Sequence, residues 1–173
     1  TRAYRHVIGL DLSLSMLKKI GNGVMKTTVG DGEHLPLQDN SVDIVVSRGC
    51  LHHLPSLSRA LDQIHRILKP GGHLVMCEPN RDALLLRLPR TLFNKSSDRF
   101  NETHKSFSMD EAVEHLGRAG FTTEHRHRFG FFGFPLCGLS DILPIIHFLP
   151  FREAFTDVLI RIDALLSTIP GIK

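Results

Sequence analysis

The feature that most constrains the fold is a set of four short apolar runs, each closed by a polar residue. The runs cover residues 7–10, 24–29, 42–46 and 74–77. They are rich in Val and Ile and lack strict alternation with polar residues, which is typical of buried parallel strands. Helical patterns separate the runs, so we expect an α/β fold with a doubly wound, mostly parallel sheet.

Two of the intervening segments have clear helical patterns. The first has an apolar stripe made of Leu57, Leu61, Ile64 and Leu68, and the Lys-Pro-Gly-Gly sequence at 69–72 is expected to stop this helix. The second begins with a capping box formed by Ser108 and Glu111 and ends at Gly120. Val113 and Leu116 are expected to face inward from it.

The polar residues that close the strands predict a binding site. In doubly wound sheets, ligands bind beyond the carboxyl ends of the strands. Four side chains at these ends are therefore expected to line one edge of the sheet, namely Asp11, Asp31, Ser47 and Glu78.

Length, net charge and cysteine content indicate the number of domains, the type of partner and the location of the protein. The 173 residues suggest a single domain, and a net charge of +3 is too mild to predict a nucleic-acid partner. The three cysteines lack CxxC spacing, so we expect free thiols and a cytoplasmic location. No apolar run is long enough to form a stable membrane span.

Four segments of the sequence carry a resemblance to a known family. They read GLDLSLSML, GDGEHLPLQDNSVDIVVSRGCLHHL, ALDQIHRILKPGGHLVMCEPN and HKSFSMDEAVEHLGRAGF, and they cover roughly residues 7–80 and 104–121. In this order and spacing they resemble the class I S-adenosylmethionine-dependent methyltransferases, in the branch called methyltransferase type 11. The resemblance implies a Rossmann-like sheet, S-adenosyl-L-methionine as cofactor, and in-line methyl transfer to a small-molecule acceptor such as a quinone, a lipid or another metabolite.

The resemblance assigns roles to two acidic residues. Asp11 stands where the family's acidic residue accepts both ribose hydroxyls of the cofactor, and a carboxylate suits a cis-diol because it has two oxygens. The alternative for Asp11 is the N-cap of a helix over 12–20. Asp31 stands where the family contacts the adenine amino group, with Gly32 letting the backbone approach the ring. Its alternative is a plain Asp-Gly turn.

Further cofactor contacts are implied at Leu12, Met16 and Ser47. Leu12 and Met16 would pack on the adenine face, although Met16 equally suits the protein core. Ser47 and Arg48 lie beside the methionine part of the cofactor and the methyl-transfer region, and Arg48 also suits a solvated loop.

Three histidines are candidates for a general base, which methyl transfer needs only when the acceptor must lose a proton. His53 is our predicted catalytic residue, ahead of His52 and His104, and a structural role is the alternative for each. A metal site at His125 and His127 is disfavoured because no carboxylate or cysteine accompanies them, so we expect no metal and a solvated edge strand there.

We expect a methyltransferase core over 1–128, with an inserted lid at 81–107, and a C-terminal helical cap over 129–173 in the same domain. The cap is aromatic, apolar and interrupted by prolines. It is predicted to be a substrate lid, with a homodimer surface and a membrane-surface patch as alternatives.

The sequence also departs from the family. The family's glycine-rich loop and its first, central strand should lie just upstream of Thr1, and its last antiparallel strand beyond Lys173. We therefore expect residues 1–173 by themselves to lack half of the cofactor site and to bind S-adenosylmethionine poorly.

Two other functions stay open at this point. One is a non-catalytic fragment or pseudoenzyme that acts as an interaction module. The other is a nicotinamide-dependent dehydrogenase, whose adenosine ribose also meets an Asp at the end of the second strand.

Overall fold

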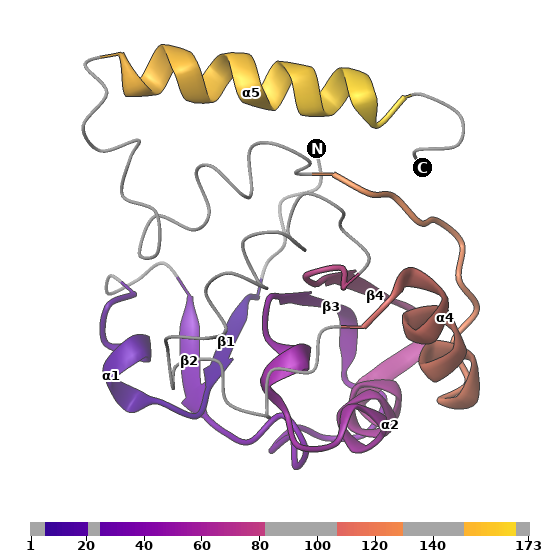
Figure 1. Ribbon diagram of the computed structural model, residues 1–173. Helices are drawn as coiled ribbons and strands as arrows, with labels where there is room; N and C mark the ends of the chain where they lie inside the picture. Colours follow the sequence, from indigo (N-terminus) through magenta and orange to yellow (C-terminus); the bar gives the residue numbers. More distant parts are fainter. Residues whose placement is uncertain (1–5, 21–24, 82–106, 130–150, 169–173) are drawn as a thin grey trace, which may run out of the picture. The chain divides into compact units, whose positions relative to one another are not determined.

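A computed structural model describes residues 6–20, 25–81, 107–129 and 151–168 (Figure 1). The chain divides into two compact units. The first comprises Thr1–Pro79 and Asn101–Thr122, and the second comprises Asn80–Phe100 and Thr123–Lys173. The predicted strands, the capping box and the candidate site all lie in the first unit.

The strands of the first unit pair in parallel, as predicted. Strand β1 (Ile8–Asp11) pairs with β2 (Lys26–Val29), and β3 (Val42–Arg48) pairs with β4 (Leu68–Cys77). In the described part of the chain these are two separate pairs and do not join into one sheet. A helix lies between the two strands of each pair along the chain, which agrees with the predicted doubly wound class.

Strand β4 begins at Leu68, earlier than the predicted start at residue 74. Helix α2 (Leu57–Ile67) ends directly before the predicted stop signal, and the chain passes at once into the strand. The Lys-Pro-Gly-Gly sequence lies inside β4, where the pairing with β3 shifts register between Val42 and Ile44. At an irregularity of this kind, one strand has extra residues between two successive pairs with its neighbour, and here that strand is β4.

The two adjacent glycines of this stretch are required for different reasons. Gly71 has a φ of +77° with open space around it, whereas a Cβ on Gly72 would lie 2.9 Å from the Lys69 carbonyl oxygen and 3.0 Å from that of Asp43. Gly71 is therefore needed for its backbone conformation and Gly72 for close approach of the backbones of β3 and β4.

We predict that alanine costs more stability at Gly72 than at Gly71. Gly72→Ala should lower the free energy of unfolding by about 2 to 3 kcal/mol, because its neighbours are backbone atoms that cannot turn away. Gly71→Ala should cost about 1 kcal/mol, and Gly71→Asn less, since Asn visits the left-handed region. Urea unfolding of the three variants checks this, and a loss of stability in Gly71→Ala as large as that in Gly72→Ala would contradict it.

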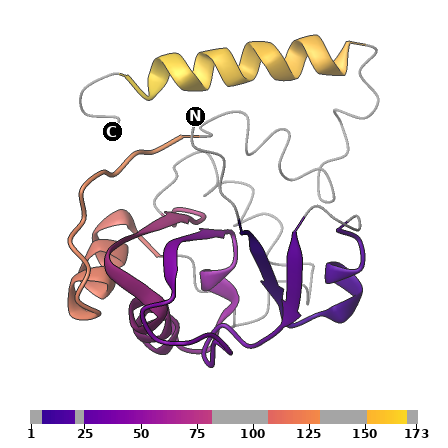
Figure 2. The ribbon, with the colours of Figure 1, turned by 180° about the vertical axis from the view of Figure 1, so that it is seen from behind.

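Helix α2 packs against β4, and α4 (Met109–Arg118) lies beside α2, as both ribbon views show (Figures 1 and 2). The predicted capping box is confirmed: Ser108 and Glu111 satisfy each other's backbone N–H groups, and Gly120 follows the helix with a φ of +89°. The short helix α1 (Leu14–Leu17) packs against β1 and β2.

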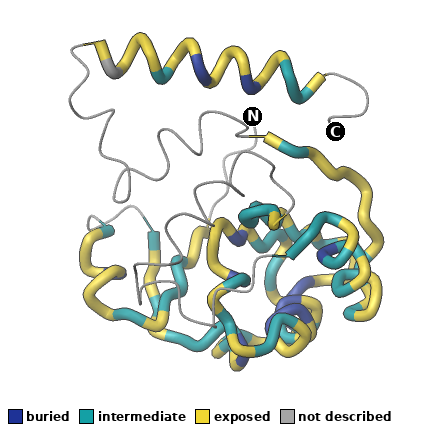
Figure 3. Tube along the Cα trace, viewed as in Figure 1, coloured by how far each residue is buried: buried dark blue, intermediate teal, exposed yellow. Residues whose placement is uncertain are grey.

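The core of the first unit is centred on the inner face of α2 (Figure 3). Its buried members are Leu51, Ala60, Leu61, Ile64 and Leu68. Three of the four residues of the predicted stripe are in this set, and Leu57 packs partly buried against it. The 3.6-residue period therefore identified the buried face correctly.

In the second unit, helix α5 (Arg152–Leu166) falls within the predicted cap. Residues 130–150 and 169–173 of the predicted cap, and residues 82–106 of the predicted lid at 81–107, lie outside the described residues. The predicted edge strand at 125–128 is wrong, because this stretch has no strand pairing. Among the helices that the structure describes, none is long and apolar enough to cross a membrane.

Candidate functional site

Asp11 closes β1 and contributes a carboxylate to the carboxyl end of the β1–β2 pair. Its Oδ1 accepts a hydrogen bond of 2.7 Å from the Ser13 backbone N–H. The N-cap of α1 is Ser13, so the alternative of Asp11 as the N-cap is wrong. Within the described part of the chain, Oδ2 of Asp11 makes no hydrogen bond to another residue.

Leu12 and Met16 provide apolar surface next to this carboxylate in the sequence. Their exposed fractions are 68% and 50%. The alternative of Met16 as a core residue is therefore wrong, and it is Leu17 that faces inward from α1. Exposed apolar side chains beside a carboxylate suit a ligand that has both a flat apolar part and hydroxyl groups.

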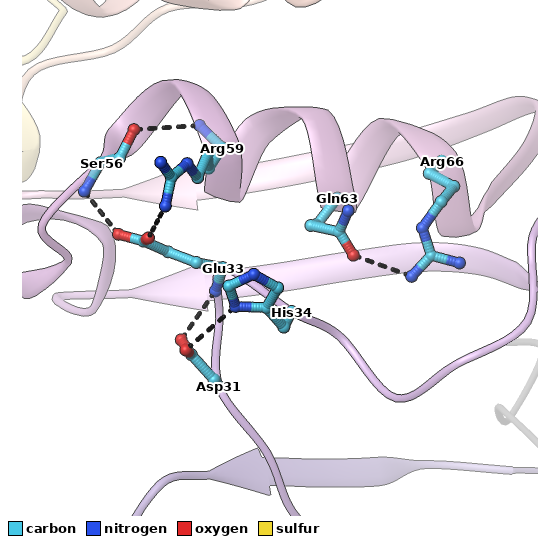
Figure 4. Close-up of polar contacts among 7 residues, drawn as sticks. All are labelled: Asp31, Glu33, His34, Ser56, Arg59, Gln63 and Arg66. Atoms are coloured by element: carbon cyan, nitrogen blue, oxygen red, sulfur yellow. Dashed lines mark hydrogen bonds and ion pairs between the residues drawn. The ribbon is translucent and has the colours of Figure 1, made fainter.

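Asp31 forms a tight turn at the end of β2 (Figure 4). Its Oδ1 accepts the Glu33 backbone N–H at 2.9 Å, and its Oδ2 lies 3.3 Å from Nδ1 of His34. The hydrogen bond from the Glu33 backbone, then that from His34, lowers the pKa of Asp31. A Cβ on Gly32 would lie 2.9 Å from Cδ1 of Leu54, so within this chain the glycine makes room for Leu54.

Glu33 is a buried carboxylate that sequence reasoning missed (Figure 4). It accepts the backbone N–H of Ser56, the N-cap of α2, and lies 3.6 Å from the Arg59 guanidinium. A carboxylate is stabilised at a helix N-terminus by the orphan N–H groups there. Glu33 thus attaches the loop after β2 to the start of α2.

Arg66 binds the carboxyl-terminal part of the loop between β2 and β3. Its guanidinium donates to the Leu35 carbonyl at 2.8 Å and to the Leu37 carbonyl at 2.9 Å. It also contacts the side chains of Gln63, as Figure 4 shows, and of Asp39. In the sequence both Glu33 and Arg66 look like ordinary surface charges, and only the long-range contacts reveal their roles.

Glu78 is the most heavily bonded carboxylate of the site, and its side chain is only 3% exposed. It directly follows β4 and receives five hydrogen bonds from the end of β3 and the turn after it. The donors are the Ser47 hydroxyl, the backbone N–H groups of Cys50, Leu51 and His52, and Nδ1 of the His52 ring. We call this set the Glu78 clamp.

Burial by itself raises the pKa of Glu78, but the hydrogen bonds from His52, Leu51 and Cys50 outweigh it and hold the pKa below the ordinary 4.5. Burial, together with the charges of Glu78 and Asp11, raises the pKa of the Cys50 thiol.

The other predicted residues are distributed around the clamp. Ser47 is buried with its hydroxyl directed to Glu78, while Arg48 is exposed on the same strand. His53 is exposed, and its ring centroid lies 3.9 Å from that of His52, which the clamp holds. His104 lies outside the described residues.

The cysteines and histidines show no metal arrangement in the part of the chain that the structure describes. No three His, Cys, Asp or Glu residues there are grouped to hold an ion. The rings of His125 and His127 stack with centroids 6.5 Å apart. Cys50 and Cys77 are free thiols, as predicted, and Cys137 lies outside the described residues.

Comparison with known proteins identifies the family. A family model described as "Methyltransferase domain" matches residues 1–76. The demethylmenaquinone methyltransferase of Lactiplantibacillus plantarum is 33% identical over 150 residues, covering 72% of this chain and 63% of that protein. The mitochondrial arginine-hydroxylase NDUFAF5 of Homo sapiens is 36% identical over 118 residues, covering 65% of this chain and 34% of that protein.

Solved structures share the fold. A Thermotoga maritima structure, described as a SAM-dependent methyltransferase and possible histamine N-methyltransferase, superposes with a TM-score of 0.60 at 28% identity. It covers 67% of this chain and 55% of that one. The chain spans less than two thirds of the length of these relatives. It belongs to the class I S-adenosylmethionine-dependent methyltransferases of type 11.

Proposed function

We propose that the carboxyl edge containing Asp11 and Asp31 binds S-adenosylmethionine, and that the protein transfers a methyl group to a small-molecule acceptor by in-line displacement. The observation that carries the proposal is the Asp11 carboxylate, half-buried at the end of β1 with Oδ2 available for a ligand. The family to which the chain belongs supports the choice of cofactor.

The residues present fit the adenosine half of this cofactor. An ionised carboxylate has about four acceptor sites, so Asp11 can take two ribose hydroxyls although Oδ1 already accepts from Ser13. The exposed side chains of Leu12 and Met16 offer an apolar surface to the adenine ring. Asp31, with its lowered pKa, is an ionised acceptor for an amino group.

The chemistry of the cofactor is a methyl group already activated on a sulfonium. The protein's part is to bind, align and exclude water. We propose that Asp11, Leu12, Met16, Asp31 and Gly32 hold the adenosine, while Ser47 contributes beside the methionine part. A buried Ser47 bonded to Glu78 acts best as a support for the backbone there.

The acceptor is proposed to be a small apolar metabolite of the quinone or lipid class. The relative named demethylmenaquinone methyltransferase supports a quinone-like acceptor. Residues 81–107 and 129–173 are proposed to close over the acceptor, since segments beyond the carboxyl edge determine specificity in such folds while the sheet binds the cofactor.

Replacing residues 81–107 by a short linker should then impair methylation of the acceptor and leave cofactor binding unchanged.

Asp11 variants test the cofactor assignment. In the natural full-length protein, Asp11→Ala should weaken S-adenosylhomocysteine binding by about 1.5 to 3 kcal/mol, or roughly 10- to 150-fold, because it removes hydrogen bonds to a charged group. Isothermal titration calorimetry measures this. Asp43→Asn is the matched control, since Asp43 is exposed on β3 and pairs with Lys69. Equal affinity of wild type and Asp11→Ala would show that the ribose lies elsewhere.

The same titration separates the other functions. An interaction module would not bind S-adenosylhomocysteine, and a dehydrogenase would instead bind reduced nicotinamide, which fluorescence detects. The relative named arginine-hydroxylase raises a further alternative on the same fold. Transfer of a labelled methyl group from S-adenosylmethionine to a reduced naphthoquinone distinguishes methyl transfer from hydroxylation.

A further inference from the structure

Helix α2 begins with a capping box that its own first turn cannot complete. In the usual box the N-cap serine accepts the backbone N–H of residue N3, and an acidic N3 side chain accepts the backbone N–H of the serine. Ser56 accepts the Arg59 N–H at 3.3 Å, but the arginine side chain at N3 has no acceptor. The Ser56 N–H donates instead to Glu33, which comes from the loop after β2 (Figure 4).

Glu33 thereby links α2 to the turn that contains Asp31. Its carboxylate is 7% exposed and lies 3.6 Å from the Arg59 guanidinium, while its backbone N–H donates to Oδ1 of Asp31 at 2.9 Å. The turn lies beside the end of β1, since the Gly30 N–H donates to the Asp11 carbonyl at 3.1 Å. One residue therefore joins the first turn of α2 to the carboxylate proposed for the adenine amino group.

The shape of this turn and its place in the fold depend on different contacts. The hydrogen bond from the Glu33 N–H to Asp31 sets the shape, because both groups belong to the turn itself. The place is set by the bond from the Glu33 carboxylate to α2 and by Gly32, which packs against Leu54 directly after the short 3-10 helix η1 (Leu51–His53). Losing the carboxylate of Glu33 should therefore leave a turn that is formed but less well placed.

We propose that Glu33 is a positioning residue for cofactor recognition: by completing the cap of α2, it holds Asp31 where the carboxylate selects the 6-amino group of adenine. The inference rests on the function proposed above, in which Asp31 accepts a hydrogen bond from that group. A purine with oxygen at position 6 offers Asp31 no donor there. Glu33 therefore governs the choice between the two purines, whereas the ribose is assigned to Asp11.

The test compares S-adenosylhomocysteine with S-inosylhomocysteine, which has oxygen in place of the 6-amino group, by calorimetry on the natural full-length protein. The wild type should prefer the adenine compound about 10- to 100-fold, the effect of one hydrogen bond to a charged group. Glu33→Ala should reduce this preference to less than about threefold and weaken S-inosylhomocysteine binding by less than about threefold. Glu33→Gln keeps an acceptor for the Ser56 N–H and should retain the preference.

Arg59→Glu separates the capping of α2 from the positioning of Asp31. Added to Glu33→Ala, it supplies a carboxylate at N3 that accepts the Ser56 N–H and completes the box within the helix. The double variant should regain the stability to urea that Glu33→Ala loses, but not the preference for adenine. It also decides the matter if Glu33→Ala alone does not fold. A double variant that regained both would show that Glu33 acts only through the helix and would overturn the proposal.

Asp39→Ala is the matched control, because it removes another ion pair between the same loop and α2, that of Asp39 with Arg66. It should leave the preference for adenine unchanged. A wild type that bound both compounds equally, or a Glu33→Ala variant that lost affinity for both by the same factor, would overturn the proposal and leave cofactor binding itself in place. A wild type that did not bind S-adenosylhomocysteine would instead overturn the proposed function, and this inference with it.

Discussion

Replacing Glu78 by alanine is expected to lower the free energy of unfolding by about 3 to 5 kcal/mol at neutral pH, as is typical when one member of a buried charged network is removed. The variant leaves the Ser47 hydroxyl and the N–H groups of Cys50, Leu51 and His52 without their acceptor. Desolvated donors without partners are costly. Urea unfolding at neutral pH measures the loss.

The control for this variant is Glu114→Ala. Glu114 is 60% exposed and pairs with Arg118 one turn later on α4. An exposed pair of this kind contributes about 0.3 to 0.5 kcal/mol. A loss at Glu78 as small as the loss at Glu114 would mean that water replaces the carboxylate in the clamp.

The Glu78 effect should also depend on pH in a defined direction. The folded-state pKa of Glu78 is lowered from 4.5, so its contribution to stability is fully present above pH 4.5 and is lost as the pH falls through the lowered value. The difference in stability between wild type and Glu78→Ala should therefore shrink in acid. A difference that grew on acidification would show that the clamp does not favour the ionised form.

The elements that the sequence predicted well are those encoded locally. Strands β1 and β3 and the capping box at Ser108 depend only on residues that are close together in the sequence. The start of β4 was missed because Lys-Pro-Gly-Gly favours a turn, and only pairing with Val42 across the sheet draws Leu68 into the strand. Non-local hydrogen bonds overrode the local signal there.

The positions of four polar residues at strand ends were predicted from the sequence, but the contacts between them were not. The sequence indicated that Asp11, Asp31, Ser47 and Glu78 lie at strand ends, since such ends meet at one edge in a parallel sheet. It carried no sign that Glu78 bonds to His52, because the two residues are far apart in the chain. The choice of His53 over His52 had no geometric basis at that stage.

The second large effect is expected in the core, where Leu61→Ala should lower the free energy of unfolding by about 3 to 5 kcal/mol. Leu61 is 0% exposed and lies among Leu51, Ile64 and Leu68, so the missing side chain leaves a cavity that the surrounding backbone of α2 and β4 can only partly fill. Leu61→Met, which conserves volume, should cost less than about 1.5 kcal/mol.

This core variant also tests how the cofactor site is held. Leu61 stabilises α2, whose first turn bonds to Glu33 through Ser56, whereas Asp11 closes β1 and takes its local hydrogen bond from Ser13. Leu61→Ala should therefore reduce stability to urea while changing S-adenosylhomocysteine affinity less than twofold at temperatures where the protein stays folded. Asp11→Ala should do the reverse. If Leu61→Ala lowered cofactor affinity as strongly as Asp11→Ala, the packing of α2 would be setting the shape of the adenosine site, and Asp11 would not be its main determinant.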